Sequence, residues 1–415
     1  MNPPPAPVRL GVIGLGRAFT LMLPTFQHDA RVHLVAATDP LDAARRQFEE
    51  DFAAPSFDSV EALCAEPQVQ AVYIASPHQF HADHACIAAA HGKHVLIEKP
   101  MALTLDDCTR MIDATQRAGV FLIVGHSHSF DLPILRTREL ISSGAYGSVR
   151  MITAFNYTDF LYRPRRPEEL DTRAGGGVIY SQAAHQIDIV RLLAGGLVTS
   201  VRAHTGAWDS ARPTEGAYSA LLGFEGGAFA TATYSGFGHF DSDQWMGYIG
   251  EMGQTKDPAN YGGARRRLLN QNTSADEAAF KVARNYGGAT YKAALKSAVK
   301  AAAPPAHQHF GHLLVSCEKA DLRPHATGVD VFADDEKFIE NLAPPTIPRI
   351  EVIDELIDAV VHGKAPLHSG EWARATLAVC LALLESAQRQ QEVAPGHQIA
   401  PATTFGLATA FGQGA

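Results

Sequence analysis

The segment that decides the fold is Val8-Arg9-Leu10-Gly11-Val12-Ile13-Gly14-Leu15-Gly16. A short apolar run that ends in two closely spaced glycines is typical of a buried strand leading into a tight turn. Helix-forming sequence follows from Arg17 to Gln27, although Pro24 should interrupt its hydrogen bonding. Such a turn points backbone N–H groups and the positive end of a helix dipole at one place, which favours a pyrophosphate. We therefore predict a dinucleotide site at Gly14 and Gly16.

Asp39 follows the next apolar run, Val32 to Thr38, and is the second element of this prediction. A carboxylate at the end of the second strand can accept hydrogen bonds from the adenosine ribose and repels a 2′-phosphate. No arginine directly follows it, so the predicted cofactor is NAD, with NADP as the alternative. Phe19 stands where the glycine fingerprint usually has Gly or Ala, so we expect the helix to pack less closely there.

Strand and helix signals alternate as far as residue 126, which predicts a doubly wound parallel sheet in a Rossmann domain over residues 8–126. Further along the chain, consecutive strand signals replace the alternation of strands and helices. This order predicts a second, α+β domain over residues 127–393 with a largely antiparallel sheet. The strands expected there are 149–158, 199–207, 216–224 and 227–235.

Helices and irregular segments complete the predicted second domain. One helix is expected from about Ser181 to Leu193, and two closing helices at 349–361 and 371–390. Residues 253–306 show no clear strand, and we interpret them as a helical, mobile insertion. The Pro/Gly/Thr-rich residues 394–415 are interpreted as a flexible tail.

Composition limits the classes of function. The 35 Lys and Arg residues against 44 Asp and Glu give a net charge of −9, which argues against nucleic acid as a partner. No apolar run approaches the ~18 residues needed to cross a bilayer, so no membrane association is expected. The five cysteines are scattered, which indicates reduced thiols in a cytoplasmic protein. A sheet with one uncovered face also predicts a homo-dimer or homo-tetramer.

Two further motifs, Ser76-Pro77-His78-Gln79-Phe80-His81 and Gly92-Lys93-His94-Val95-Leu96-Ile97-Glu98-Lys99-Pro100, carry a resemblance. In this order they resemble the signature of the Gfo/Idh/MocA oxidoreductase family. The resemblance implies that Lys99 contacts the reacting hydroxyl and the nicotinamide ribose, and that Glu98 lies close to the nicotinamide. It continues through the Gly175-Gly176-Gly177 turn to His185 and Asp188, and into the C-terminal helices.

The role of Lys99 can also be inferred from its chemistry alone, independently of the family resemblance. Oxidising an alcohol by hydride transfer needs a base for the hydroxyl proton, and a nearby nicotinium cation disfavours the charged amine and lowers its pKa. We therefore predict Lys99 as the acid–base residue. The alternative is a surface lysine on a loop at the end of a strand.

His185 matches a histidine that points at the substrate in the resembled family. The family often has an Asp-x-Gly-x-His pattern, whereas this chain has Ser181 and Ala183 before His185. Losing that Asp removes an acceptor for sugar hydroxyls, so an ordinary sugar substrate is disfavoured. The alternative for His185 is a hydrogen-bonded helix histidine without a catalytic role.

The segment Tyr162-Arg163-Pro164-Arg165-Arg166-Pro167 lies shortly before the glycine turn that leads to His185. Guanidinium groups suit bidentate binding of a carboxylate, so Arg163, Arg165 and Arg166 are predicted substrate contacts. The alternative is a solvated basic loop or a subunit contact.

His126 and His128 follow the last strand of the first domain, where the active-site cleft should open, and are predicted to contact the substrate. We predict no metal at this pair, nor at His307, His309 and His312, because we find no acidic or thiol complement nearby.

At subfamily level, residues 14–19, 76–81 and 125–130 resemble the phthalate cis-4,5-dihydrodiol dehydrogenases. This implies NAD-dependent oxidation of a carboxylated cis-diol to a catechol, a reaction driven by restoring the aromatic ring. Predicted cofactor contacts are Gly14, Gly16, Arg17, Ala18, Asp39, Ser76, Pro77, His81, Glu98 and Lys99, and predicted substrate contacts also include Ser181 and Asp188. The alternatives are a sugar, inositol or sugar-acid dehydrogenase, and a non-catalytic dinucleotide-sensing regulator.

Overall fold

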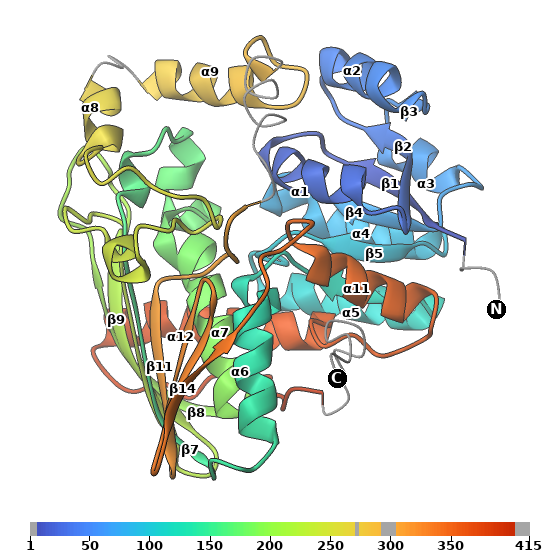
Figure 1. The fold of residues 1–415 in the computed structure, drawn as a ribbon. Coiled ribbons are helices and arrows are strands. Elements are labelled where there is room, and N and C mark those ends of the chain that lie inside the picture. Colours follow the sequence, from blue (N-terminus) through green and yellow to red (C-terminus); the bar gives the residue numbers. More distant parts are fainter. Residues whose placement is uncertain (1–5, 270–273, 292–303, 403–415) are drawn as a thin grey trace.

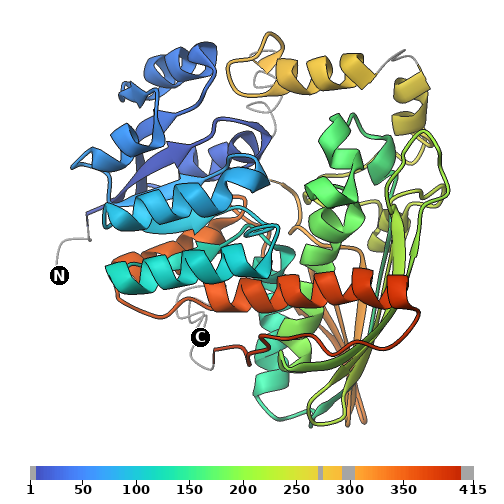
Figure 2. The ribbon, with the colours of Figure 1, turned by 180° about the vertical axis from the view of Figure 1, so that it is seen from behind.

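The computed structural model describes residues 6–269, 274–291 and 304–402. Its N-terminal part is a six-stranded parallel sheet in the order β3-β2-β1-β4-β5-β6, seen at the upper right of Figure 1 and from behind in Figure 2. The strands are β1 (Val8–Ile13), β2 (Val32–Thr38), β3 (Ser56–Phe57), β4 (Ala71–Ile74), β5 (His94–Ile97) and β6 (Leu122–Val124).

The central strands are apolar because helices cover both faces of this sheet. Every residue of β4 and β6 is buried. The covering helices are α1 (Arg17–His28), α2 (Asp42–Phe52), α3 (Val60–Ala65), α4 (His81–Ala90) and α5 (Leu105–Ala118). This parallel sheet is the predicted Rossmann domain.

The turn after β1 needs a glycine at position 14. Gly14 has a φ of +93°, and a Cβ there would lie 2.8 Å from the backbone nitrogen of Ser76. Glycine adopts this conformation without steric cost. The Phe19 ring is fully buried and meets Tyr286 edge-on at 5.1 Å, while the looser packing of α1 at this position stays a prediction.

The second domain is an eight-stranded sheet in the order β14-β13-β12-β11-β7-β10-β9-β8. Only the β7–β10 pair is parallel, so the sheet is largely antiparallel as predicted. Its strands are β7 (Val149–Tyr157), β8 (Val198–Gly206), β9 (Ala217–Phe224), β10 (Phe229–Ser235), β11 (His312–Cys317), β12 (Ala320–His325), β13 (Gly328–Ala333) and β14 (Lys337–Asn341).

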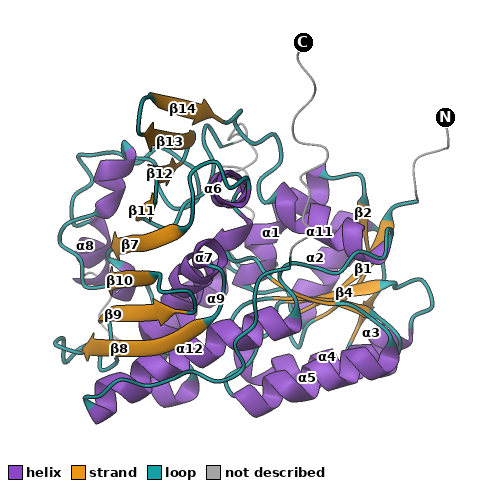
Figure 3. Ribbon diagram, turned by 90° about the horizontal axis from the view of Figure 1, so that it is seen from below, coloured by secondary structure: helices purple, strands orange, loops and turns teal. Residues whose placement is uncertain are grey.

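Helices pack on one face of this sheet, the face toward the Rossmann domain (Figure 3). They are α6 (Leu132–Ser142), α7 (Ala184–Ala194) and α12 (Gly370–Arg389). The opposite face carries large exposed apolar side chains, among them Leu221 and Phe229, which are 50% and 45% exposed. The sheet therefore has one covered and one open face.

The structure differs from the sequence predictions in several elements. Strands β11 to β14 were not predicted. The helix expected from Ser181 begins as a π-helical turn at Ile179–Ala183 and becomes α-helical only in α7. The insertion is helical in its described part, with α8 (Gly263–Leu269) and α9 (Ser274–Arg284), while residues 270–273 and 292–303 lie outside the described residues.

The chain also returns to the first domain late in the sequence. Helix α11 (Ile350–Val360) buries Val352, Ile353 and Leu356 in the same core as β1 and α1, so the boundary predicted for the second domain is wrong there. The predicted flexible tail is packed as far as residue 402, since Arg191 contacts Gln398 and Ile399. Its remainder, 403–415, lies outside the described residues. Among the described helices, none is long and apolar enough to span a membrane.

Candidate active site

The loops that leave the carboxyl ends of β4, β5 and β6 face the second domain, and Lys99 lies at their centre. Its Nζ donates a 2.6 Å hydrogen bond to the carbonyl oxygen of Ser181, across the boundary between the domains. Ser181 lies in the π-helical turn, where the usual i→i−4 ladder is interrupted and carbonyl groups are free to accept other donors. The predicted base is therefore held by the second domain.

Burial changes the ionisation of Lys99. Loss of hydration lowers the pKa of Lys99 to about 8, although the Glu98 and Glu251 carboxylates act in the opposite direction. Glu98 is itself held by the Tyr73 hydroxyl at 2.5 Å, and burial raises the pKa of Glu98. A lysine with this pKa has a substantial neutral fraction near neutral pH, as a general base requires.

His185 lies near Lys99, on the first turn of α7. Its Nδ1 accepts the backbone N–H of His128 at 3.4 Å, which assigns the proton to Nε2. Burial, followed by the charge of Lys99, lowers the pKa of His185 well below its usual value. His185 is therefore a neutral hydrogen-bond donor and not a base.

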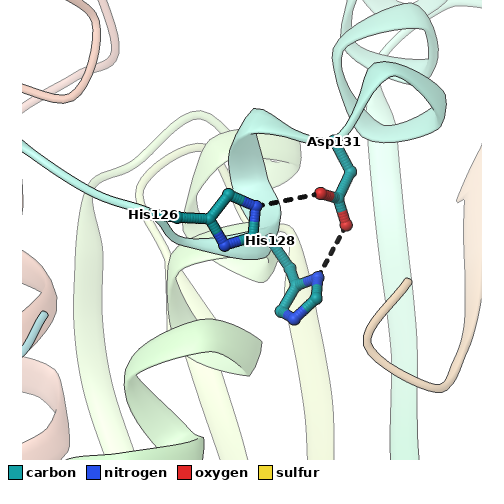
Figure 4. Close-up of side chains that lie close together, drawn as sticks. All are labelled: His126, His128 and Asp131. Carbon is teal, nitrogen blue, oxygen red and sulfur yellow. Dashed lines mark hydrogen bonds and ion pairs between the residues drawn. The ribbon is translucent and has the colours of Figure 1, made fainter. Parts of the chain in front are cut away.

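The two other predicted histidines form a cluster with Asp131 (Figure 4). Asp131 accepts from His126 Nε2 at 3.3 Å and from His128 Nδ1 at 2.7 Å. Burial lowers the pKa of His126 to about 3, whereas for His128 the carboxylates of Asp131 and Glu251 outweigh burial and raise the pKa to about 9. The cluster thus contains one neutral and one protonated imidazole around a carboxylate.

This geometry corrects the reason given for predicting no metal here. An acidic complement is present, since the ligand-capable atoms of His126, His128 and Asp131 all lie within 4.8 Å of one another. Two imidazoles and a carboxylate are donors that divalent transition metals accept. In the structure the imidazole rings of His126 and His128 both form hydrogen bonds with the Asp131 carboxylate, so its oxygens already have N–H partners. The histidines of the second motif, His307 and His309, bind different backbone carbonyls. His307 binds Ala343 O, and His309 binds Ile249 O.

Glu251, which the sequence analysis did not single out, faces three cationic groups. Its carboxylate lies 3.4 Å from His128 Nε2 and 4.0 Å from Arg163 Nη1, and it also influences Lys99. These cations outweigh burial and lower the pKa of Glu251. The signal in the sequence was weak, because Glu251 stands alone before the predicted insertion.

The three predicted arginines have different environments. Arg166 lies against Glu168 and Glu169 at 3.1 and 3.6 Å, and Arg163 also approaches Asp159 at 3.4 Å. Arg165 stacks 3.6 Å from the ring centroid of Phe160 and donates through Nη2 to the Phe160 carbonyl.

The Nε of Arg165 is buried without a hydrogen-bond partner in the described part of the chain. An unpartnered buried N–H is costly, and a ligand that accepts from it removes that cost. The Nε of Arg166 is likewise buried without a hydrogen-bond partner, but it lies 3.1 Å from the Glu168 carboxylate. Of the three arginines, Arg165 is thus the one with no carboxylate within 4.0 Å in the described part of the chain.

The predicted cofactor contacts form a cradle at the start of α1. Gly16 has no side chain with which to cap α1, so the first N–H groups of the helix, at Arg17 and Ala18, are free to meet an anion. Asp39 accepts from the N–H groups of Leu15 and Leu41 at 2.7 and 2.8 Å, which ties the glycine turn to the end of β2. These residues fit a dinucleotide.

Other predicted residues are engaged by the protein. Both ring nitrogens of His81 face backbone carbonyls, of Ser76 and Pro100, so His81 has no nitrogen left for a cofactor and instead braces the Ser76-Pro77 turn. The Ser181 hydroxyl donates to the Gly177 carbonyl, which leaves its own carbonyl, and not its side chain, facing Lys99.

Asp188, predicted to contact the substrate, is likewise occupied by protein donors. It accepts from Trp372 at 2.7 Å, from Thr376 at 2.6 Å and from Ser129. Ser129 in turn contacts His368, whose other ring nitrogen lies 2.8 Å from Glu355. This buried chain fixes the loop that carries His126 and His128 against α7, α11 and α12.

Known proteins resemble the chain along most of its length. A Comamonas testosteroni enzyme named 1-carboxy-3-chloro-3,4-dihydroxycyclohexa-1,5-diene dehydrogenase is 53% identical over 379 residues, covering 91% of this chain and 94% of that protein. The myo-inositol 2-dehydrogenase of Thermotoga maritima is 29% identical over 196 residues, covering 47% of this chain and 57% of that protein.

Solved structures share the fold. A dehydrogenase from Bordetella bronchiseptica RB50 superimposes with a TM-score of 0.86 at 42% identity, covering 94% of this chain and all of that one. An oxidoreductase from Agrobacterium radiobacter, solved with NAD+, L-tartaric acid and magnesium, has a TM-score of 0.67 at 17% identity and covers 93% of this chain and 98% of that one.

Both domains also match family descriptions. Residues 8–126 match an oxidoreductase family with an NAD-binding Rossmann fold, and residues 134–256 match the Gfo/Idh/MocA C-terminal domain. With these matches and 53% identity to a dehydrogenase over 91% of its length, the chain belongs to the Gfo/Idh/MocA family of NAD-binding oxidoreductases.

Proposed function

We propose that this protein oxidises a carboxylated cyclohexadiene cis-diol to the corresponding catechol, with NAD as the hydride acceptor. The observation that carries the proposal is the pairing of a desolvated Lys99 with the unpartnered guanidinium N–H of Arg165 beside the same cleft. The first group is suited to a hydroxyl proton and the second to a carboxylate. The 53%-identical relative from Comamonas is named for a substrate of this class.

The reaction divides into steps that the residues of the chain support. Bound NAD supplies the hydride acceptor, and hydride leaves the carbinol C–H. The Lys99 amine takes the hydroxyl proton, while His185 Nε2–H donates to the oxygen that becomes the carbonyl. In a diol that carries a hydrogen on both carbinol carbons, enolisation of the resulting ketone restores the aromatic ring, so the protein mainly needs to align the diol and remove one proton.

The number of carboxylates on the ring distinguishes two versions of the substrate. The phthalate dihydrodiol indicated by the subfamily resemblance carries two, whereas the compound in the name of the Comamonas relative carries one carboxylate and a chlorine. Among the described residues Arg165 has no carboxylate within 4.0 Å, whereas Arg163 approaches Asp159 and Glu251, and Arg166 lies against Glu168 and Glu169. This count favours a ring with one carboxylate, as in a chlorobenzoate-type dihydrodiol.

The experiment that tests the proposal follows the absorbance of reduced cofactor with four substrates. They are the 1-carboxy-3-chloro cis-diol, phthalate cis-4,5-dihydrodiol, a cis-dihydrodiol without a carboxylate, and myo-inositol. We expect the highest kcat/KM for a carboxylated diol. Robust turnover of myo-inositol alone would instead establish the polyol dehydrogenase alternative, and no cofactor reduction with any compound would favour the regulator.

Lys99→Met should reduce kcat by about 10²–10⁴-fold, because it removes the base and keeps a side chain of similar length. In the unmodified protein kcat should rise with pH and level off above about 8, since only the neutral amine accepts the proton and the pKa of Lys99 is about 8. The variant should lose this rising limb and keep its affinity for NADH, measured by fluorescence titration. A variant with near-normal kcat would move proton transfer to another group.

Arg165→Met should lower kcat/KM for a carboxylated diol by roughly 10- to 150-fold, the effect of losing a charge-assisted hydrogen bond worth about 1.5–3 kcal/mol. Arg166→Met is the matched control, because its guanidinium already contacts Glu168 and Glu169. The loss should be much smaller on a diol without a carboxylate. Equal losses on both diols would make Arg165 a structural residue.

Asp39→Ala should weaken binding of NAD and narrow its preference over NADP, because the variant loses both the ribose acceptor and the charge that repels a 2′-phosphate. Kd values for NADH and NADPH, measured side by side, check this. The assignment of Asp39 is wrong if the unmodified protein already prefers NADPH by about tenfold, or ~1.4 kcal/mol.

The open sheet face supports an assembly of two or four identical subunits. Exposed apolar side chains on adjacent strands, such as Met151 beside Phe229, form a patch that a second copy can bury. Leu221→Lys combined with Phe229→Lys should shift the protein to monomers in analytical ultracentrifugation, because two charges would be buried at the contact. An unchanged mass would place the interface elsewhere.

A further inference from the structure

Three arginines from separate parts of the chain lie close enough to interact, since the charges of Arg284 and Arg349 both act on Arg17. Arg17 is the first residue of α1, Arg284 is the last of α9, and Arg349 directly precedes α11. Two contacts dock the later segments on α1. The Tyr286 ring meets Phe19 at 5.1 Å, and the Thr25 hydroxyl donates to the Pro348 carbonyl at 2.5 Å.

Helix α9 connects the second domain to the Rossmann domain. At its start, Glu277 forms a buried bidentate pair with Arg212 at 3.0 and 3.1 Å, which fixes it to the second domain. After its end, the Tyr286 hydroxyl donates to Asp51 at 2.6 Å on α2. Figures 1 and 2, from opposite sides, show α9 crossing between the two domains.

Arg349 is held in an unusual position. Its backbone is left-handed with a φ of +56°, a conformation that is unfavourable for a non-glycine residue. Its guanidinium is 9% exposed and contacts only the Gln308 amide oxygen at 3.4 Å and the Met252 sulfur at 3.5 Å, neither of them an anion. The fold therefore keeps a buried cation here without neutralising it.

The other two arginines also lack a counter-charge. Arg17 contacts the Thr20 hydroxyl at 3.4 Å, and Arg284 lies 5.4 Å from the Phe280 ring. Within the described residues, no carboxylate lies within 4.0 Å of any of the three guanidinium groups. Burial, and then the charges of Arg284 and Arg349, lower the pKa of Arg17, so both of these cations lie near enough to repel Arg17.

We propose that Arg284 and Arg349 bind the diphosphate of the cofactor together with Arg17, so that the cofactor is clamped by two segments outside the Rossmann domain. A diphosphate carries two negative charges and suits guanidinium donors, and the glycine turn and the start of α1 already direct it to this place. Its binding removes the repulsion among the three cations. The insertion thereby completes the cofactor site through Arg284.

The test measures cofactor binding without substrate, so it is independent of the proposed reaction. NADH and ADP-ribose, which keeps the diphosphate and lacks nicotinamide, are titrated calorimetrically into the unmodified protein, Arg284→Met and Arg349→Met. We expect each variant to weaken both ligands by about tenfold or more, and to flatten the dependence of Kd on salt, because a screened ionic contact is lost. Arg267→Met, an exposed arginine on α8 of the same insertion, is the control and should match the unmodified protein.

Thermal melts monitor folding, and Arg349→Lys, which retains the charge, replaces Arg349→Met if the latter does not fold. An unchanged Kd for NADH and ADP-ribose in both the Arg284 and Arg349 variants would overturn the proposal. A loss restricted to NADH would place the contact at the nicotinamide and would also overturn it. If Arg349 variants keep both affinities and lose turnover of carboxylated diols only, Arg349 binds substrate and its proposed role is wrong.

Discussion

The hydrogen bond from Lys99 Nζ to the Ser181 carbonyl joins the two domains at the candidate reaction centre. A lysine is neutral near pH 8 only if it is kept from water, and in this fold the desolvation comes from closing the Rossmann domain against the π-helical turn and α7. The domain arrangement is therefore a chemical requirement. Helix α11 in the Rossmann core and α9 between the domains both help to maintain it.

A second requirement is that the loop after β6 stays fixed while it carries charged groups. Asp188 meets this requirement by accepting from Ser129, Thr376 and Trp372, and the Ser129 contact extends the network to His368. Buried polar networks in which every group is satisfied rigidify a core, whereas partly satisfied ones destabilise it. Asp188, which was predicted to contact the substrate, thus anchors the loop that carries His128.

The parts of the site that were predicted correctly are those encoded locally. Gly14 follows a strand within one short segment, so the turn after β1 can be predicted from sequence, and the dinucleotide contacts at this turn stay a prediction. Glu251 and Arg349 were missed because each is isolated in sequence and reaches the cleft only through tertiary folding. Strand β12 was missed for another reason, since Pro324 and alternating charged residues weaken its strand signal, and its Arg323 is neutralised only by Asp330 on β13. Asp131 stands three residues after His128, close enough in sequence for an acidic partner to be predicted there.

Several energetically unfavourable features lie where the ligands are expected to bind. The unpaired Nε of Arg165, the left-handed Arg349 and the desolvated Lys99 each reduce stability when the site holds no ligand. The buried Arg212, by contrast, is paired with Glu277. A buried cation that the fold supports but does not neutralise keeps its full attraction for an anion that arrives later. The excess positive charge of the cleft therefore matches a doubly charged cofactor linker and a carboxylated ring, although the protein as a whole has a net charge of −9.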